Sequence, residues 1–301
     1  MLNKKLVFIG DTNSINIELI HKSHNYLKNK VEYILIGNKK ELSKYLRKIS
    51  SKVSVNEIYN PLNIENYNKN KLNIFNVENI SSEKSTNLIN QIKISNYLSK
   101  KTKFDLITLP INKSIFKKKL EFNGMTEFLG EINNKKTIML MYGDKFSIIP
   151  FTTHINLKYV TKYIKKNLIN NFIKNVLKQI KNQKYNLKFD RIKFLCVNPH
   201  CSENKTLGIE DSVISNVISN FNFIEGPLAA DSAFLNIKQK TLYLSTYHDQ
   251  ALIPFKIINK KSFNLTLGLN YRRLSPAHGT ASNIIFQNIA DNKSYLECMK
   301  F

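Results

Sequence analysis

The segment TLYLSTYHDQALIPFK, residues 241–256, joins an apolar run to a cluster of polar groups. TLYLST predicts a short strand that is buried in a sheet. It is followed at once by His248 and Asp249, whose side chains bind metals and handle protons. We expect the apolar run that comes next, which ends at Lys256, to form a strand-end loop. Polar groups at the end of a buried strand are typical of ligand sites in α/β sheets.

Two other apolar strands are followed by polar clusters in the same way. KLVFIG, residues 5–10, leads to Asp11, and IKFLCV, residues 192–197, leads to NPHCSEN. Further strands are predicted at VEYILIG and FDLITLP, and KTIMLMYGDKFSIIPF resembles a hairpin. Strands that alternate with helices predict an α/β fold with largely parallel sheets. The predicted helices are NKKELSKYLRKI capped by Asn38, STNLINQIKISNYLSKK, a long amphipathic helix over about residues 157–183, GIEDSVISNVISNF and most of the tail from residue 281.

Length and composition limit the class of protein. The chain has 301 residues, of which 42% are hydrophobic, and we place a domain boundary near residue 130. Only a short apolar run, residues 6–10, follows the first lysines, so we expect no signal peptide. No apolar run reaches the roughly 20 residues that a membrane helix needs. The three cysteines form no CxxC pair, which favours a reducing compartment, and we expect a cytoplasmic protein without a membrane partner.

The formal net charge of +24 raises the hypothesis of a nucleic-acid-binding protein. The lysines are scattered among asparagines and isoleucines, as in NKKELSKYLRKISSK, and do not form one block. This composition is typical of AT-rich codon usage, with the lysines on solvated helix faces. We therefore expect no nucleic-acid partner, and the charge favours the approach of anionic substrates.

The chain contains six histidines. His21 and His24 lie on a lysine-rich helix, where we expect them to be exposed. Each of the other four, taken alone, is more often a hydrogen-bonded structural histidine than a ligand. Three imidazoles with an open fourth position, however, form a catalytic zinc arrangement. Neither GxGxxG nor the P-loop motif occurs, so these nucleotide sites are not predicted. The four candidates are His154, His200, His248 and His278.

Eight stretches, taken in order along the chain, resemble the 4-hydroxythreonine-4-phosphate dehydrogenases of pyridoxal phosphate synthesis. The most specific are YHDQALIPFK and the NPH motif with its following Gly and Glu. The full set is IGDTNSINIE, DLITLPINK, GMTEFL, TTHINLKYV, NPHCSENKTLGIED, GPLAADSAF, YHDQALIPFK and NLTLGLNYRRLSPAHGTA.

The resemblance implies a fold similar to that of isocitrate and isopropylmalate dehydrogenases, in which two α/β/α lobes flank a cleft. Residues 1–130 and 275–301 would form the first lobe, and residues 131–274 the second, with the metal ligands and the dimer interface. The resemblance also implies a homodimer whose site is shared across the interface. The implied divalent metal, Zn, Co or Mg, is held by three histidines, the last of them donated by the second subunit: His154, His200 and His248.

The implied reaction oxidises 4-phosphohydroxy-L-threonine with NAD, or with NADP as an alternative. Its product, 2-amino-3-oxo-4-phosphooxybutanoate, loses carbon dioxide to give 3-amino-2-oxopropyl phosphate. A metal at the hydroxyl lowers its pKa and stabilises the alkoxide. Asp231 and Asp249 are candidates for orienting a metal ligand or relaying a proton.

Further residues map to substrate and cofactor contacts of the family. The loop that cradles the NAD adenosine in the wider superfamily corresponds to His278, Gly279 and Thr280. The residues implied to bind the phosphorylated substrate are Thr126, Lys256, Asn264 and Arg273.

Some positions depart from the family pattern. Met125 stands where the family has a histidine that contacts substrate, and methionine neither donates a hydrogen bond nor carries charge. The family's NPHAGE is NPHCSE here, and the aspartate usual before HGT is Ala277. These departures leave open a dehydrogenase of the same scaffold for another phosphorylated hydroxy acid, or a drifted relative of low activity. A non-catalytic binding protein, motivated by the charge, is the remaining alternative.

Overall fold

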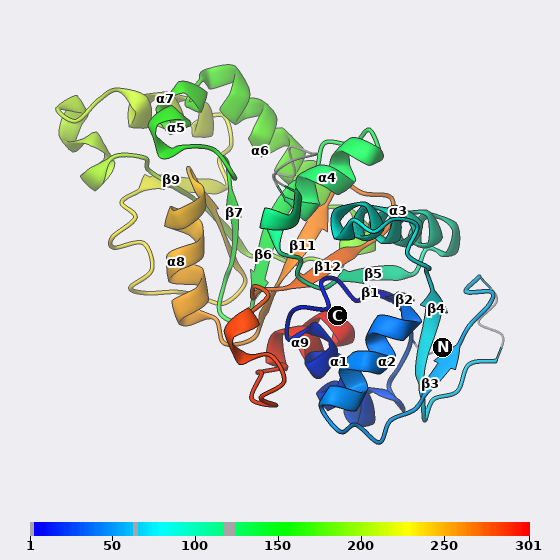
Figure 1. The fold of residues 1–301 in the computed structure, drawn as a ribbon. Coiled ribbons are helices and arrows are strands. Elements are labelled where there is room, and N and C mark those ends of the chain that lie inside the picture. The colour runs from blue at the N-terminus through cyan, green and yellow to red at the C-terminus, as the bar shows by residue number, and fades with distance from the viewer. Residues whose placement is uncertain (1–2, 63–65, 117–123) are drawn as a thin grey trace. The chain divides into compact units, whose positions relative to one another are not determined.

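Buried apolar strands alternate with helices along the chain, so the predicted α/β class is confirmed (Figure 1). The computed structural model describes residues 3–62, 66–116 and 124–301. The chain divides into unit 1, residues 1–135 and 269–301, and unit 2, residues 136–268. These divisions lie close to the boundaries that we placed after residues 130 and 274.

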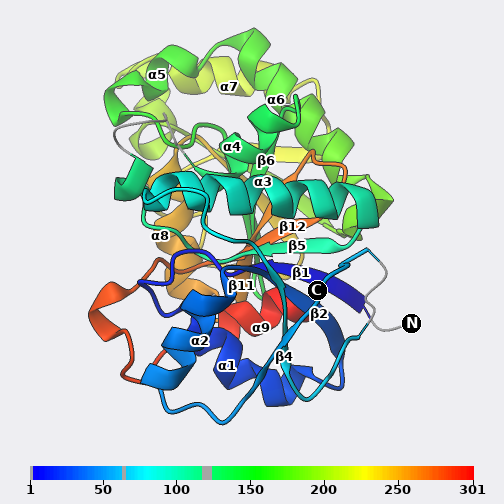
Figure 2. The same cartoon turned by 45° about the vertical axis from the view of Figure 1, so that its right-hand side comes forward.

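Unit 1 contains a parallel sheet with the strand order β3-β4-β2-β1-β5-β12. Helices α1, α2 and α9 cover one face of this sheet, and α3 covers the other (Figure 2). Its strands are β1 (Asn3–Phe8), β2 (Val31–Gly37), β3 (Val55–Glu57), β4 (Leu72–Asn76), β5 (Asp105–Thr108) and β12 (Arg273–Pro276). Its helices are α1 (Asn16–Leu27), α2 (Lys39–Lys48), α3 (Lys84–Thr102), α4 (Met125–Ile132) and α9 (Lys293–Lys300).

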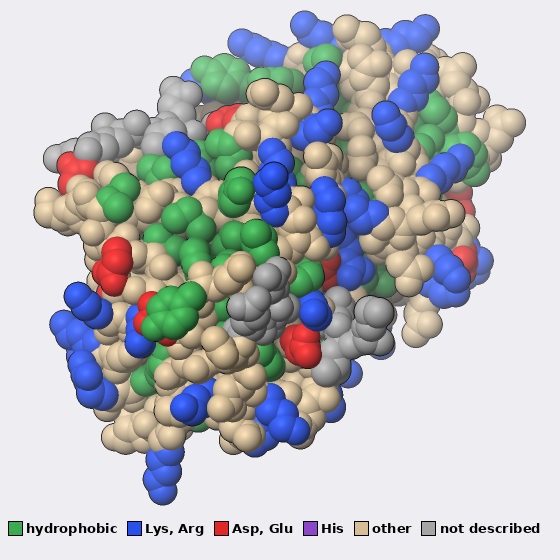
Figure 3. All heavy atoms as spheres, turned by 90° about the vertical axis from the view of Figure 1, so that its right-hand side faces the viewer, with side chains coloured by type: hydrophobic (Ala, Val, Ile, Leu, Met, Phe, Trp, Pro, Cys, Tyr) green, Lys and Arg blue, Asp and Glu red, His purple; other side chains and the backbone are tan. Residues whose placement is uncertain are grey.

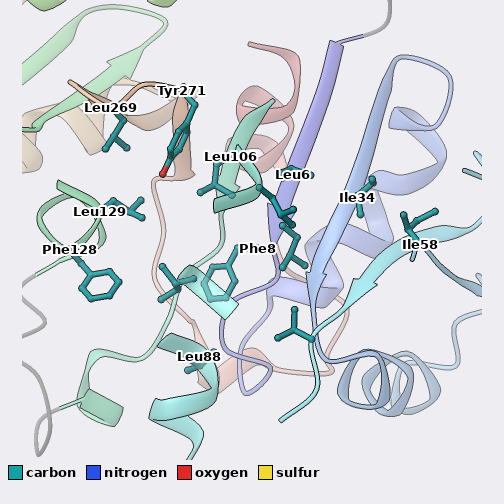
Figure 4. Packing of buried hydrophobic residues seen from close by; sticks show 14 of the residues in the cluster. Leu6, Phe8, Ile34, Ile58, Leu88, Leu106, Phe128, Leu129, Leu269 and Tyr271 are labelled. Carbon is teal, nitrogen blue, oxygen red and sulfur yellow. The ribbon is translucent and has the colours of Figure 1, made fainter. Parts of the chain in front are cut away.

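The core of unit 1 explains why its strands are apolar at nearly every position. A parallel sheet that is covered on both faces buries both sets of side chains. Leu6 and Phe8 of β1, Ile34 of β2 and Leu106 of β5 are all at most 1% exposed, and α3 adds Leu88 to the same cluster (Figure 4). Each such side chain contributes about 1.5–3 kcal/mol of stability on burial.

The predicted N-cap of helix α2 is confirmed, since Asn38 accepts a hydrogen bond from the Glu41 amide at 3.1 Å.

The two ends of the chain meet in unit 1. Strand β12, from the C-terminal segment, pairs in parallel with β5. Helix α9 packs on β12 and on α1. Unit 1 is therefore complete only when residues 269–301 have joined residues 1–135.

Unit 2 contains strands in the order β11-β6-β7-β10-β8-β9. Strands β6 and β7 pair antiparallel with Met141 opposite Ile148, which confirms the predicted hairpin. Strands β7, β10, β8 and β9 are parallel neighbours. The strands are β6 (Ile138–Gly143), β7 (Ser147–Pro150), β8 (Arg191–Leu195), β9 (Ile224–Leu228), β10 (Thr241–Ser245) and β11 (Ser262–Leu267). The helices are α5 (Val160–Tyr163), α6 (Lys166–Ile180), α7 (Glu210–Ile218) and α8 (His248–Ile258).

The prediction of a loop after residue 247 was wrong, because the segment forms helix α8. The helix buries Ala251 and Phe255, which lie one turn apart, and exposes Ile253 and Lys256. Pro254 lies inside the helix, where it removes only the backbone bond to residue 250. The strand-end position of His248 is as predicted, but the helix replaces the loop.

The long helix predicted over residues 157–183 is broken into α5 and α6. Lys165 is extended, with φ −124° and ψ 140°. In one continuous helix the buried side chains Ile164 and Ile169 would point about 140° apart, at about 100° per residue. The break lets both reach the core, so packing overrides the helical pattern.

The tail predicted to be mostly helical has a short 3-10 helix, Ser282–Ile284, and helix α9, and residues 285–292 between them are not helical. Ala281, Phe286 and Asn288 have positive φ angles. Side chains of α1 bind the tail backbone: Glu18 accepts from the Ala290 amide at 2.8 Å, and Lys22 donates to the Ala290 carbonyl at 2.9 Å. These contacts take backbone groups that a helix would use.

His24 is buried at 3% exposure, contrary to the expectation that it is exposed, and its Nδ1 lies 2.7 Å from the Tyr33 hydroxyl. Burial lowers the pKa of His24 below its ordinary value.

Because the pKa of His24 is lower in the folded protein, the unfolded chain binds the proton more tightly than the folded one does. The free energy of unfolding must therefore fall as the pH drops below about 6.5. We expect the free energy of unfolding in urea to decrease between pH 7.5 and 5.5, and to decrease less in a His24→Gln variant. An equal pH dependence in both proteins would contradict this expectation.

Lysine and arginine side chains on the face shown in Figure 3 are dispersed among polar and apolar groups and do not form one block. None of the helices in the described ranges is long and apolar enough to cross a membrane.

Candidate metal and substrate site

Three of the predicted histidines follow three neighbouring strands of unit 2. Strand β10 lies between β7 and β8 and is parallel to both. His154 follows β7, His248 follows β10, and His200 follows β8. Because the carboxyl ends of parallel strands lie at the same edge of a sheet, the fold delivers all three imidazoles to one edge of unit 2.

The rings of His154 and His248 lie together. Their centroids are 5.5 Å apart, at an interplanar angle of 42°. The segment after β7 is tied to β10, since the Phe151 amide donates to the Ser245 carbonyl at 2.7 Å and the Thr152 hydroxyl donates to the Thr246 carbonyl at 2.8 Å. Two imidazoles on one tetrahedral ion, with nitrogens about 2.0–2.1 Å from it, have ring centres roughly 5 Å apart. The pair therefore fits a shared divalent cation.

Asp249 fixes the orientation of the His248 ring. Its Oδ1 lies 2.7 Å from His248 Nδ1. A carboxylate at Nδ1 favours the tautomer with the proton on Nδ1, which leaves the lone pair of Nε2 for a ligand. This contact supports the prediction that Asp249 orients a metal ligand.

His200 lies with Asp231, at 3.7 Å between Nδ1 and Oδ2, and both side chains are more than half exposed. This separation is longer than a hydrogen bond. In residues 3–62, 66–116 and 124–301, no three His, Cys, Asp or Glu side chains converge on one metal position. Within one chain, then, the structure pairs His154 with His248, whereas the resemblance implied that His248 comes from the second subunit.

The segment that carries His200 has an unusual backbone. All six residues from His200 to Lys205 have positive φ angles, between 41° and 78°, and none is glycine. Left-handed conformation costs roughly 1–2 kcal/mol per L-residue. Ser202, at φ 67°, stands where the resemblance has glycine, the residue that best tolerates this conformation.

The surroundings of Cys201 do not favour a nucleophile beside His200. Burial, with a further contribution from the neighbouring Cys196 thiol, raises the pKa of Cys201 to about 12. The nucleophile would be the thiolate, and the Cys201 thiol is protonated at neutral pH.

The two predicted substrate residues of unit 2 differ in setting. Lys256 is exposed in the last turn of α8, two helical turns beyond His248. Asn264 lies in β11, and its carboxamide oxygen is buried without a hydrogen-bond partner among the described residues. A buried acceptor without a donor is costly, so this oxygen suits a donor group on a ligand.

The two predicted substrate residues of unit 1, Arg273 and Thr126, lie together. The Arg273 guanidinium is 3% exposed; its Nε donates to Thr108 Oγ1 at 2.8 Å, and its Nη1 lies 3.4 Å from Thr126 Oγ1. Burial lowers the pKa of Arg273 to about 10, so the group still carries its charge at neutral pH. A buried guanidinium held by hydroxyl groups is suited to a phosphate or a carboxylate.

Met125, which replaces the family histidine, is the first residue of α4 and precedes Thr126. It is partly buried and packs against the core cluster of unit 1. The substitution therefore puts an apolar contact where the resemblance has a polar one.

The residues predicted to bind the cofactor lie after β12. The Thr280 carbonyl accepts from the Ile15 amide at 3.2 Å, His278 Nδ1 lies 2.9 Å from the Gly279 carbonyl, and Gly279 is exposed. They do not line the described cavity of unit 1, which has a volume of about 470 Å³. That cavity lies beyond the carboxyl ends of β1, β2 and β4, and its charged and aromatic lining comprises Glu41, Lys44, Tyr45, Lys48, Lys84 and Phe286.

Sequence reasoning missed the supporting residues. Gln250 accepts from the Thr246 amide at 2.8 Å and donates to the Cys196 carbonyl at 2.7 Å, so it ties the end of β10 to that of β8. Asp211 accepts hydrogen bonds from the segment before His200. Gln250, Asp211 and Thr108 all lie in stretches that carry the resemblance, YHDQALIPFK, NPHCSENKTLGIED and DLITLPINK, but no local pattern shows what these side chains contact.

Comparison with known proteins shows the family of the chain. Residues 29–301 match the family model of the pyridoxal phosphate biosynthetic protein PdxA. The chain is 32% identical to 4-hydroxythreonine-4-phosphate dehydrogenase of Sulfurihydrogenibium sp. (strain YO3AOP1), over 99% of this chain and 96% of the relative. It is 31% identical to the enzyme of the same name from Aquifex aeolicus (strain VF5), over 99% and 97%.

A similar fold occurs in solved structures. The structure of 4-hydroxythreonine-4-phosphate dehydrogenase from Klebsiella pneumoniae matches with a TM-score of 0.80 at 21% identity, covering 100% of this chain and 97% of that one. Terephthalate 1,2-cis-dihydrodioldehydrogenase from Burkholderia xenovorans LB400 matches at 0.59 with 17% identity, covering 98% and 96%. Because residues 29–301 match the family model and relatives at least 30% identical cover nearly the whole chain, the chain belongs to the PdxA family of pyridoxal phosphate biosynthetic proteins, and its Sulfurihydrogenibium and Aquifex relatives are named 4-hydroxythreonine-4-phosphate dehydrogenases.

Proposed function

We propose that the protein catalyses the metal-dependent oxidation of 4-phosphohydroxy-L-threonine by NAD in the cytoplasm. The product is 2-amino-3-oxo-4-phosphooxybutanoate, a β-keto acid that decarboxylates to 3-amino-2-oxopropyl phosphate. The observation that carries the proposal is the ring pair His154–His248, 5.5 Å apart, in a chain of this family. The free thiols Cys196, Cys201 and Cys298 support a reducing compartment.

The proposed cation is held by His154, His200 and His248. Once bound, it supplies a positive charge that favours the alkoxide form of the substrate hydroxyl. Asp249 keeps the His248 tautomer that presents Nε2, and Asp231, 3.7 Å from His200 Nδ1, would do the same for His200 once it came within hydrogen-bond distance. The donor set is imidazole, which suits zinc or cobalt better than magnesium.

A homodimer would complete this set. Because His154 and His248 already lie together in one chain, His200 of a second copy is the ligand that fits this geometry. The segments that carry the proposed ligands also expose large apolar side chains, as protein interfaces do. Those at least 60% exposed are Leu157, Ile209, Leu235, Ile253 and Ile257.

The anionic groups of the substrate are assigned to cationic side chains. Arg273 offers a preorganised charge with Thr126 beside it, and Lys256 offers a mobile one. The Asn264 carboxamide oxygen would accept a hydrogen bond from the substrate ammonium or hydroxyl group. A different phosphorylated hydroxy acid is the second candidate substrate, because Met125 removes a polar contact from α4.

The cavity of unit 1 supports a dinucleotide cofactor. A crevice beyond the carboxyl ends of parallel strands is where α/β sheets bind nucleotides. Lys44 and Lys48 provide charge for a pyrophosphate, whereas Lys84 is paired with Asp11, and Phe286 and Tyr45 lie with their ring centroids 4.6 Å apart. His278, Gly279 and Thr280 remain proposed cofactor residues, since Phe286 belongs to the segment that they begin.

The proposal is tested by NADH formation with and without a chelator. We expect turnover of 4-phosphohydroxy-L-threonine with NAD, loss of more than about 90% of it after EDTA treatment, and recovery on addition of Zn²⁺ or Co²⁺. Parallel assays with other phosphorylated hydroxy acids and with NADP define the specificity. Turnover that is insensitive to the chelator would refute the metal-dependent mechanism, and turnover of another hydroxy acid alone would identify the second candidate.

A further inference from the structure

The segment from Val197 to Lys205 holds a conformation that its own residues do not favour. His200 and the five residues after it are left-handed, and no glycine relieves the backbone. Strained backbone of this kind persists only where surrounding groups fix it, and it clusters at functional sites. Contacts from outside the left-handed stretch must therefore hold the backbone that carries His200.

Asp211 supplies those contacts. It lies in the first turn of α7 and is 3% exposed. Its Oδ1 accepts from the Val197 amide at 2.7 Å, and its Oδ2 accepts from the Asn198 amide at 3.1 Å and from the Ser202 hydroxyl at 2.7 Å. One buried carboxylate thus binds the backbone before His200 and a side chain after it.

Two neighbouring polar side chains complete this arrangement. The side-chain nitrogen Nδ2 of Asn198 donates to Ser202 Oγ and to Glu210 Oε2, both at 3.0 Å. All three hydrogen bonds to Asp211 need acceptor oxygens, which the carboxylate provides on both sides. An isosteric asparagine turns one oxygen into a donor that faces another donor.

We propose that Asp211 is a positioning residue that holds the left-handed His200 segment and thereby sets the affinity of the site for a divalent cation. This inference rests on the proposed role of His200 as a metal ligand. Asp211 does not touch the cation or the substrate; it acts through the backbone of Val197 and Asn198. Without it, the segment relaxes towards right-handed or extended conformations, and the imidazole moves.

The test compares Asp211→Asn with the wild type by isothermal titration of the metal-free full-length protein with Zn²⁺ and Co²⁺. Residues that orient metal ligands typically change affinity by 10–100-fold, so we expect binding at least about tenfold weaker. Hydrogen exchange of the metal-free protein should also be faster in peptides that cover residues 197–206. This second readout reports on the segment itself and does not depend on catalysis.

Asn259 gives a matched control. It is 4% exposed in the same unit and accepts hydrogen bonds from the amides of Lys145 and Phe146, at 2.8 and 3.2 Å. Asn259→Ala should lower stability but leave cation affinity within about twofold of the wild type. Should Asp211→Asn prove too unstable to titrate, Ser202→Ala removes one of the three bonds and should give a smaller loss of affinity.

The outcomes separate the two proposals. If the wild type binds the cation and Asp211→Asn binds it equally well, the role of Asp211 is refuted while the metal site stands. A loss of affinity that is as large in Asn259→Ala also refutes it, since the effect is then one of general stability. If the wild type binds neither Zn²⁺ nor Co²⁺, the proposed metal site fails, and this inference fails with it.

Discussion

His248→Ala is expected to abolish metal binding and turnover together. The substitution removes one imidazole of the pair that lies 5.5 Å apart and leaves Asp249 without its ring partner. Loss of one of three protein ligands weakens a catalytic cation site severely, and we expect turnover to fall by at least about 10³-fold. Bound Zn²⁺ or Co²⁺ is measured by plasma mass spectrometry after dialysis, and turnover by NADH formation.

His21→Ala is the matched control, because His21 lies in α1 of unit 1 and has no proposed role. We expect it to retain the metal content and the turnover of the wild type. If His248→Ala keeps both properties, the proposed site is wrong. If it keeps the metal but loses turnover, His248 acts on the substrate and does not hold the cation.

Arg273→Lys is expected to give the second large effect. Lysine keeps the charge but lacks the planar fork that binds Thr108 and would bind a phosphate or a carboxylate. Loss of a buried, hydrogen-bonded charge contact costs about 2–5 kcal/mol, so kcat/KM for 4-phosphohydroxy-L-threonine should fall by about 30-fold or more. The affinity of the protein for Zn²⁺ should not change, because Arg273 belongs to no proposed metal contact.

The neighbouring Arg272 provides the control for this prediction. Arg272 binds Asp105 through Nε at 2.7 Å and through Nη2 at 2.6 Å, so it is also a bidentate arginine beside β12. Arg272→Lys should lower the free energy of unfolding, with kcat/KM changed by less than about threefold. An equal loss of kcat/KM in both variants would show that Arg273 stabilises the fold and does not bind substrate.

The sequence predicted the parts of the fold that depend on local pattern. The strands, the hairpin and the helix cap at Asn38 arise from apolar runs and capping chemistry within a few residues. The predicted strand ends also indicated where the three histidines lie, because residues that follow buried parallel strands lie at the same edge of the sheet. The resemblance to the family then indicated that His154, His200 and His248 together bind one metal ion.

The rest depended on contacts between distant residues. The break before α6 and the irregular tail arise from core packing and from side chains of α1, which no local pattern contains. The left-handed segment after Pro199 contains no glycine, the residue that would have indicated positive φ angles in the sequence. Asp211, which binds this segment, lies several residues after it. The pairing of His154 with His248 depends on the strand order β7-β10-β8, which only the folded sheet reveals.

The return of the C-terminal segment to unit 1 sets an order of events during synthesis. Residues 136–268 leave the ribosome before β12 and α9 do, so every strand of unit 2 is available while β5 still lacks its neighbour. The nascent chain thus exposes an unpaired edge at β5 until β12 has been made, a state in which other polypeptides can pair with that edge. Strand β12 therefore protects β5, which is made much earlier, from aggregation.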